Sequence, residues 1–205
     1  MNIGEWVQLF LNQFKAVGWL ECAGVGFSVA EVLFARVNKV WLYPTGIISV
    51  IITTYIFYHS GLYAESLLNL YYLVMSIYGW WFWVHRRADD PLPITRASAK
   101  DWTTTALIVA LGYVLLYFML DRFTKSSVPM FDAWVSATAW TGMWLLAKRK
   151  LENWLLLNIS NAFAVPLLFY KGLPMYALLT IFLFIIAVQG YFKWKKQVDT
   201  RKEPA

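Results

Sequence analysis

Apolar residues in this chain gather into seven long runs, separated by short polar segments. The runs are 19–37, 40–58, 62–84, 102–120, 131–147, 151–170 and 174–194. A helix of about 20 residues crosses roughly 30 Å of hydrocarbon, and the runs are close to that length. Backbone amides left unpaired in lipid cost several kcal/mol each, and the short alternating segments of a barrel are absent. The sequence therefore predicts an all-α integral membrane protein with seven transmembrane helices.

Charge placement supports this class and predicts the orientation. Hydrophobic residues make up 60% of the 205 residues and charged residues only 15%, whereas a soluble domain carries about 25% charged residues. The net charge of +6 is spread over short clusters between the runs, which argues against a nucleic-acid partner. With the N-terminus outside, 14 of the 18 Lys and Arg residues fall inside. The positive-inside rule thus predicts the N-terminus outside and the C-terminus inside.

An internal repeat divides the chain into two similar units. Trp41-Leu42 matches Trp154-Leu155 with an offset of 113 in the numbering, and Gly79 and the aromatic residues after it match Gly190 and those after it with an offset of 111. Two three-helix units in the same orientation need one extra crossing, which gives a 3+1+3 parallel-repeat arrangement with a site near the midplane. The expected domains are a short N-terminal amphipathic helix (1–18), a first unit (19–84), a polar linker with the central linking helix (85–130), a second unit (131–194) and a cytoplasmic tail (195–205).

The sixth run carries the most distinctive candidates for a binding site. Trp154, Asn158 and Asn161 recur at spacings of four and three, so they share one helix face. Buried amides need partners, and they serve either as interhelical glue or as ligands for solute hydroxyls. The indole on the same face favours a site, because it can cover a flat or cationic ring.

The third run ends in an aromatic cluster that begins at Tyr78. Trp81 and Phe82 fit an interfacial aromatic belt, whereas Trp80 and Trp83 continue the stripe of Asn69 and Tyr72 and are expected to face the interior.

Three further positions are candidates from other runs. Glu31 is the one carboxylate deep in a run, where a charge is costly and tends to face a cavity or a partner. It can pair with Arg36 or Lys39, be protonated, or attract a cationic solute. Gln189 fits either a site or a snorkelling role. Trp140 either lines the same cavity or packs.

Enzymatic chemistry has little support in the sequence. The two histidines, His59 and His85, lie at opposite ends of their runs, and no Gly-rich phosphate loop or HExxH motif is present. The acidic pair at Asp89 and Asp90 belongs to a charged loop that is typical of solvated segments. We therefore expect no catalytic residues, no metal site and no cofactor.

Together these residues resemble the PnuC-type vitamin transporters, a family that moves nicotinamide riboside across bacterial inner membranes. The resemblance covers about residues 19–194. It rests on Glu31 with the following Asn38-x-x-Trp41-x-Tyr43-Pro44, on Tyr78-Gly79-Trp80-Trp81-x-Trp83, and on Trp154-Leu-Leu-Leu-Asn158-Ile-Ser-Asn161. It implies facilitated diffusion, a homotrimer, and a fold similar to SWEET proteins with both units in one chain.

The chemistry of the candidate residues fits such a solute. Nicotinamide riboside is a pyridinium cation with a ribose and an amide; Trp rings suit the cation, and Asn or Gln suits the hydroxyls. The expected substrate-binding residues are Trp154, Asn158, Asn161, Trp80, Trp83, Asn69, Tyr72, Gln189, Glu31 and Trp140. The same fold carrying thiamine or riboflavin is the nearest alternative, and a membrane enzyme or receptor is a distant one.

Overall fold

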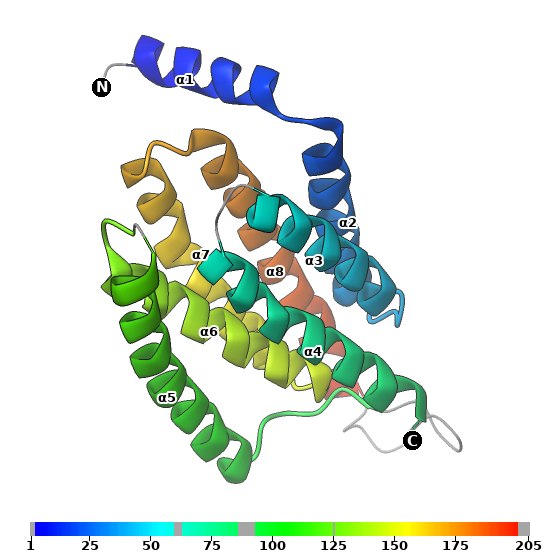
Figure 1. Cartoon of the computed structure of the whole chain (residues 1–205). Coiled ribbons are helices and arrows are strands. Elements are labelled where there is room, and N and C mark those ends of the chain that lie inside the picture. Colours follow the sequence, from blue (N-terminus) through cyan, green and yellow to red (C-terminus); the bar gives the residue numbers. More distant parts are fainter. Residues whose placement is uncertain (1–2, 60–62, 86–92, 125, 201–205) are drawn as a thin grey trace.

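The computed structural model describes residues 3–59, 63–85, 93–124 and 126–200, and these residues form eight helices (Figure 1). The helices are α1 (Ile3–Ala16), α2 (Trp19–Arg36), α3 (Leu42–His59), α4 (Tyr63–His85), α5 (Ala99–Phe123), α6 (Pro129–Ala147), α7 (Asn153–Tyr170) and α8 (Pro174–Thr200). Each expected run is therefore a helix, and the residues before the first run form α1.

Local sequence explains several of the helix ends. Ser98 caps α5: its hydroxyl accepts a hydrogen bond from the Asp101 backbone N–H, and the Asp101 carboxylate accepts one from the Ser98 N–H. This reciprocal arrangement is a capping box. Pro129 and Pro174 begin α6 and α8, where the missing N–H of proline costs nothing. The last helix runs to Thr200. It therefore continues past the expected end of the apolar run into the polar residues that follow.

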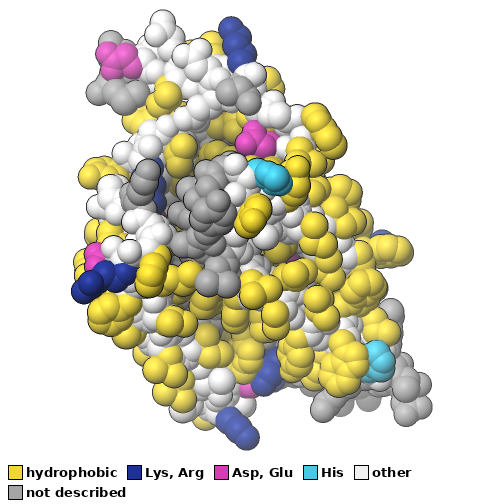
Figure 2. Space-filling view, viewed as in Figure 1, with side chains coloured by type: hydrophobic (Ala, Val, Ile, Leu, Met, Phe, Trp, Pro, Cys, Tyr) yellow, Lys and Arg dark blue, Asp and Glu magenta, His cyan; other side chains and the backbone are white. Residues whose placement is uncertain are grey.

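The helices have the character of a membrane protein. By length and composition, α5, α7 and α8 are each able to cross a membrane, and a fourth span is added if the bent pair α1 and α2 counts as one broken span. Hydrophobic side chains cover much of the visible face, with few charged groups among them (Figure 2). The prediction of an all-helical membrane protein is confirmed, whereas the seven spans remain a prediction.

Six helices form a closed ring. α3 packs between α2 and α4, and α7 packs between α6 and α8. α2 also packs against α8, and α4 against α6, so the two three-helix units are joined along two seams. α5 lies outside the ring against α6 (Figure 1). α1 crosses one end of the molecule, where Trp6 meets Phe169 edge to face at 5.5 Å between ring centroids.

The two units repeat with a constant offset of 111 in the residue numbers, which we call the repeat offset. After α2, the Asn38 N–H donates to Ala35 O at 2.9 Å; after α6, the Arg149 N–H donates to Leu146 O at 2.9 Å. Asn38 and Arg149 also share a positive φ, of 57° and 53°.

A side-chain hydrogen bond repeats with the same offset. Ser49 Oγ donates to Gly24 O at 3.0 Å between α3 and α2 of the first unit. At the equivalent positions of the second unit, Ser160 Oγ donates to Val135 O at 2.8 Å. Backbone and side-chain contacts therefore give one register for the whole repeat.

This register corrects one of the two offsets that the sequence suggested. The expected match of Trp41 with Trp154 is wrong by two positions. The equivalent of Trp154 is Tyr43: the Tyr43 N–H donates to Val40 O as the Trp154 N–H donates to Leu151 O. Each of these two rings packs against a glycine, Tyr43 against Gly79 and Trp154 against Gly190, and the two glycines are related by the repeat offset. Trp41 is exposed instead.

A large buried core lies at the end of the protein that carries the α2–α3 loop (37–41) and the α6–α7 loop (148–152), which we call the loop end. Tyr43, Trp83, Trp154 and Trp194 form one core there. The segment before α5 docks on the same end: the Thr95 N–H donates to Arg149 O at 3.1 Å, and the Leu151 N–H donates to Thr95 O at 2.9 Å. Part of the expected polar linker is thus ordered against the second unit.

Basic residues that were expected inside lie at the loop end. Arg96 pairs with Asp199 at 3.2 Å, and Lys150 pairs with Asp101 at 3.1 Å. At the opposite end, Lys171 pairs with Asp132 at 2.6 Å. The acidic pair Asp89–Asp90 and five of the basic residues in the orientation count lie outside the described residues, namely Arg86, Arg87, Lys125, Arg201 and Lys202.

Candidate solute-binding site

A cavity of about 320 Å³ lies inside the ring, and all six ring helices contribute to its wall. It is lined by Ser28, Glu31, Val32 and Ala35 from α2, Ser49, Val50 and Thr53 from α3, Asn69 and Tyr72 from α4, Ala139, Met143 and Leu146 from α6, Trp154, Leu157 and Asn161 from α7, and Leu183 and Ala187 from α8. Such a volume falls at the small end of the range of small-molecule sites, about 300–1,000 Å³.

The cavity lies on the axis that relates the two units, because equivalent positions line it from both sides. Five pairs of lining residues are related by the repeat offset: Ser28 and Ala139, Val32 and Met143, Ala35 and Leu146, Val50 and Asn161, and Tyr72 and Leu183. The side chains, however, are not equivalent. The first unit supplies hydroxyls, an amide and the carboxylate, whereas the second unit supplies mainly apolar groups with Trp154 and Asn161. The cavity thus suits an asymmetric solute.

Glu31 owes its position to a glycine on the neighbouring helix. A Cβ at Gly46 would lie 2.6 Å from Glu31 Cδ, which is far inside van der Waals contact. Only glycine therefore lets this carboxyl group lie against α3 on the cavity wall. In the second unit the arrangement is inverted: Gly142 occupies the position of Glu31, and Leu157 occupies that of Gly46. The second unit has no carboxylate at the equivalent place.

Neither expected partner of Glu31 forms an ion pair with it among the described residues. Arg36 Nη1 donates to Gln189 Oε1 at 2.5 Å. Within the described part of the chain, no ion pair reaches Glu31. The alternative of a Glu31–Arg36 or Glu31–Lys39 pair is therefore not realised in this structure. Gln189 does not line the cavity.

Trp154 lines the cavity and is held in place by its neighbours. This residue is 1% exposed, and its ring meets the Trp194 ring edge to face at 5.6 Å between centroids. A Cβ at Gly190 would lie 2.7 Å from Trp154 Cζ2, so glycine is needed there for the ring to fit. Trp154 Nε1 and Asn69 Nδ2 are both buried without a hydrogen-bond partner among the described residues. Buried donors of this kind are costly unless a ligand or water satisfies them.

The structure separates the expected site residues into two groups. Glu31, Asn69, Tyr72, Trp154 and Asn161 line the cavity. The others do not.

Each residue of the second group has a different environment. Trp80 is 42% exposed, so the expectation that it faces the interior is wrong. Trp83 is 2% exposed but packs below the cavity, where Nε1 donates to Ala147 O at 3.0 Å. Trp140 stacks on Tyr71 at 4.3 Å between centroids. Asn158, one turn below Asn161, is absent from the cavity wall and has a buried Oδ1 with no partner among the described residues.

Sequence reasoning missed the small polar residues of the first unit. Ser28 precedes Glu31 by one helical turn, and Ser49 and Thr53 are one turn apart on α3; all three line the cavity. The spacing of Ser28 from Glu31 was a usable signal, since residues three apart share a helix face.

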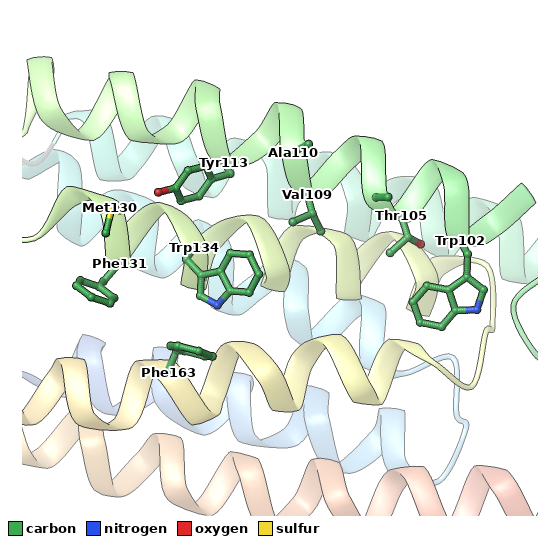
Figure 3. Close-up of a pocket in the computed structure, with 10 residues that line it drawn as sticks. Trp102, Thr105, Val109, Ala110, Tyr113, Met130, Phe131, Trp134 and Phe163 are labelled. Atoms are coloured by element: carbon green, nitrogen blue, oxygen red, sulfur yellow. The ribbon is translucent and has the colours of Figure 1, made fainter. Parts of the chain in front are cut away.

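A second, larger cavity of about 710 Å³ lies between α5, α6 and α7, outside the ring (Figure 3). Its wall is built from aromatic and aliphatic side chains, including Tyr113, Trp134 and Phe163. None of the expected site residues lies there. A polar solute finds few partners on this wall, so the cavity inside the ring is the better candidate.

A small cavity between two repeated three-helix units of an all-helical membrane protein is the arrangement of a class of solute transporters. A sequence profile described as nicotinamide mononucleotide transporter matches residues 18–196. The chain belongs to the nicotinamide mononucleotide transporter family. The resemblance to PnuC-type transporters is thereby confirmed.

Individual relatives agree with this assignment. The nicotinamide riboside transporter PnuC of Escherichia coli is 23% identical over 209 residues, which cover 87% of this chain and 85% of that protein. The protein of the same name from Neisseria mucosa is 26% identical over 211 residues, covering 94% and 80%. The crystal structure of the vitamin B3 transporter PnuC superposes with a TM-score of 0.70 at 23% identity, covering 96% of this chain and 88% of that chain, which shows a shared fold.

Asn161 lines the cavity and Asn158 does not, so substitutions of these two amides should differ in their effect on solute binding. Asn161→Ala is expected to weaken solute binding by about 1–3 kcal/mol, since it leaves a buried polar group of the solute unpaired. Asn158→Ala should change affinity by less than about 0.5 kcal/mol, because Asn158 does not line the cavity. Isothermal titration of both purified variants measures this. Equal losses would mean that Asn158 reaches the solute as well.

Proposed function

We propose that this protein is a uniporter for nicotinamide riboside, which it moves by facilitated diffusion through the cavity between its two units. The observation that carries the proposal is the composition of the cavity wall: one carboxylate, one indole and two amides around a space of about 320 Å³. The names of the relatives supply the substrate class. Nicotinamide riboside combines a cationic ring, hydroxyls and an amide, which these groups complement.

Each part of the solute has a matching group in this proposal. The Trp154 ring stacks on the pyridinium, an interaction worth about 2 kcal/mol when it is desolvated. Glu31 is the one acidic or basic side chain among the described lining residues, and it attracts the positive charge. Asn69, Asn161 and the hydroxyls of the first unit bind the ribose and the carboxamide.

Thiamine and riboflavin are the alternative solutes. Thiamine is also a cation, so Glu31 favours it over neutral riboflavin, and the small cavity disfavours the large riboflavin ring. Isothermal titration of the purified protein with the three vitamins tests the proposal. We expect the tightest binding for nicotinamide riboside; tighter binding of either other vitamin would reassign the substrate.

Uniport follows from the lack of a second charged group beside Glu31 among the described residues of the cavity wall. Protein in liposomes is expected to equilibrate the solute without concentrating it. Accumulation under an imposed proton or sodium gradient would instead indicate coupling, provided that the membrane potential is clamped, because a cationic solute follows voltage.

For the membrane arrangement we propose seven spans, α2 to α8, as two units (19–84 and 131–194) joined through 85–130, with 1–18 at the interface. The loop end faces the cytoplasm of a bacterial inner membrane, because its basic residues follow the positive-inside rule. In a Cys22→Ser background, a thiol from Lys196→Cys should react only from the cytoplasmic side and one from Lys171→Cys only from outside. Equal reaction of both from outside would contradict this orientation. The homotrimer that the family resemblance implies remains a prediction.

A further inference from the structure

We propose that Trp83 and Trp194 act as a pair of crossed latches that hold the loop end of the cavity shut. Both hydrogen bonds must then break before a solute leaves through this end. Trp83, near the end of α4, donates its Nε1–H to Ala147 O at 3.0 Å, at the end of α6. Trp194, in α8, donates its Nε1–H to Ala35 O at 3.1 Å, near the end of α2. Each indole therefore reaches from its own unit to the first helix of the other.

The two latches are equivalent in the repeat. Trp83 and Trp194 are related by the repeat offset, and the accepting residues Ala35 and Ala147 are equivalent to within one position. The last carbonyls of a helix have no partner inside the helix, and a carbonyl oxygen has two lone pairs. Ala35 O therefore accepts the Trp194 bond in addition to the bond from the Asn38 N–H. The two hydrogen bonds cross the two seams of the ring. Any separation of the units at this end therefore stretches both hydrogen bonds.

Both latch indoles are buried and packed against neighbouring rings. Trp83 and Trp194 are 2% and 0% exposed. The Tyr43 ring meets Trp83 edge to face at 5.2 Å, as the Trp154 ring meets Trp194 at 5.6 Å. The Arg149 guanidinium lies 3.8 Å from the centroid of Trp83, so this indole is held on three sides.

Two residues link the Trp194 latch to the solute site. Trp154 lines the cavity and also contacts the Trp194 latch. Ala35, whose carbonyl accepts the Trp194 bond, lines the cavity too. A solute that stacks on Trp154 therefore acts on a ring in contact with a latch.

Sided labelling of a cavity thiol tests the proposal without any vitamin, so its outcome is independent of the substrate. The probe is Ser28→Cys in a Cys22→Ser background, because Ser28 lines the cavity. Trp83→Phe and Trp194→Phe keep a ring and remove the donor. Trp81→Phe is the matched control, since Trp81 is on the same helix as Trp83 but is 56% exposed. A membrane-impermeant methanethiosulfonate reagent is applied to vesicles of both orientations.

We expect each latch variant to speed labelling from the loop end by about three- to tenfold, as the loss of one hydrogen bond predicts. The double variant should roughly multiply the two effects. Labelling from the opposite side should stay close to that of the Trp81→Phe control, and the thermal unfolding midpoint should fall by no more than the loss of one buried hydrogen bond and a smaller ring explains. Unchanged labelling in both latch variants would overturn the proposal. So would an equal rise from both sides, because local unfolding and not gating would then expose the thiol.

Discussion

Glu31→Gln is expected to weaken binding of a cationic solute by about 10- to 100-fold, the largest loss of affinity that we anticipate from a single substitution. The change keeps the shape of the side chain and removes its charge. A hydrogen bond to a charged group is worth about 1.5–3 kcal/mol, and the described residues of the cavity wall offer no second carboxylate to replace it. Isothermal titration with nicotinamide riboside measures the loss.

A neutral ligand provides the control for this substitution. Nicotinamide shares the ring and the amide but carries no positive charge, so its weak binding should be nearly the same in the natural protein and in Glu31→Gln. If both ligands lose affinity equally, Glu31 shapes the cavity without attracting charge. If neither does, the carboxylate does not act on the solute.

The helices and the existence of a repeat were predictable from the sequence, because long apolar runs admit few alternatives in a membrane. The register of the repeat was not. Trp41 and Trp154 share a residue type, yet the structure equates Trp154 with Tyr43. Both positions carry a large ring that packs on a glycine of the third helix in its own unit, Gly79 in α4 and Gly190 in α8. A comparison of residue identities does not detect this property.

The sequence also did not show which of the expected residues line the cavity and which only pack. Trp80 and Trp83 were expected on one interior stripe with Asn69 and Tyr72, but Trp80 is exposed and Trp83 is buried against α6 without lining the cavity. In a membrane, lipid is as apolar as the protein interior, so hydrophobicity does not tell which face of a helix is buried.

Small hydroxyls on the cavity wall are equally hard to find. Thr53 Oγ1 donates to Ser49 O at 2.8 Å, within its own helix. Serine and threonine make this local bond at many positions in membrane helices, so a hydroxyl alone does not indicate a site. Ser28 was detectable only through its spacing from Glu31. Glu31 was distinctive because a carboxylate at that depth is rare.

The glycine that supports Trp154 gives the second large effect. Gly190→Ala would place a Cβ 2.7 Å from Trp154 Cζ2, so the ring must shift. Overpacking of this kind costs about 1–3 kcal/mol of stability, and the shifted indole no longer presents the same face to the solute. We expect a lower free energy of unfolding together with at least a tenfold loss of affinity. Gly26→Ala is the control, since a Cβ there would meet no side chain and no other helix within 4 Å. Affinity should be unchanged in this variant and the free energy of unfolding should not fall, because alanine is the better helix former.

The equivalent glycine in the first unit separates stability from binding. Gly79→Ala would push a Cβ into the Tyr43 ring, so its cost in stability should resemble that of Gly190→Ala. Tyr43, unlike Trp154, does not line the cavity, and affinity should therefore change little. Denaturation measures the free energy of unfolding of both variants, and isothermal titration measures their affinity for the solute. Equal losses of affinity would mean that both rings support the site alike, and that the solute does not distinguish the second unit from the first.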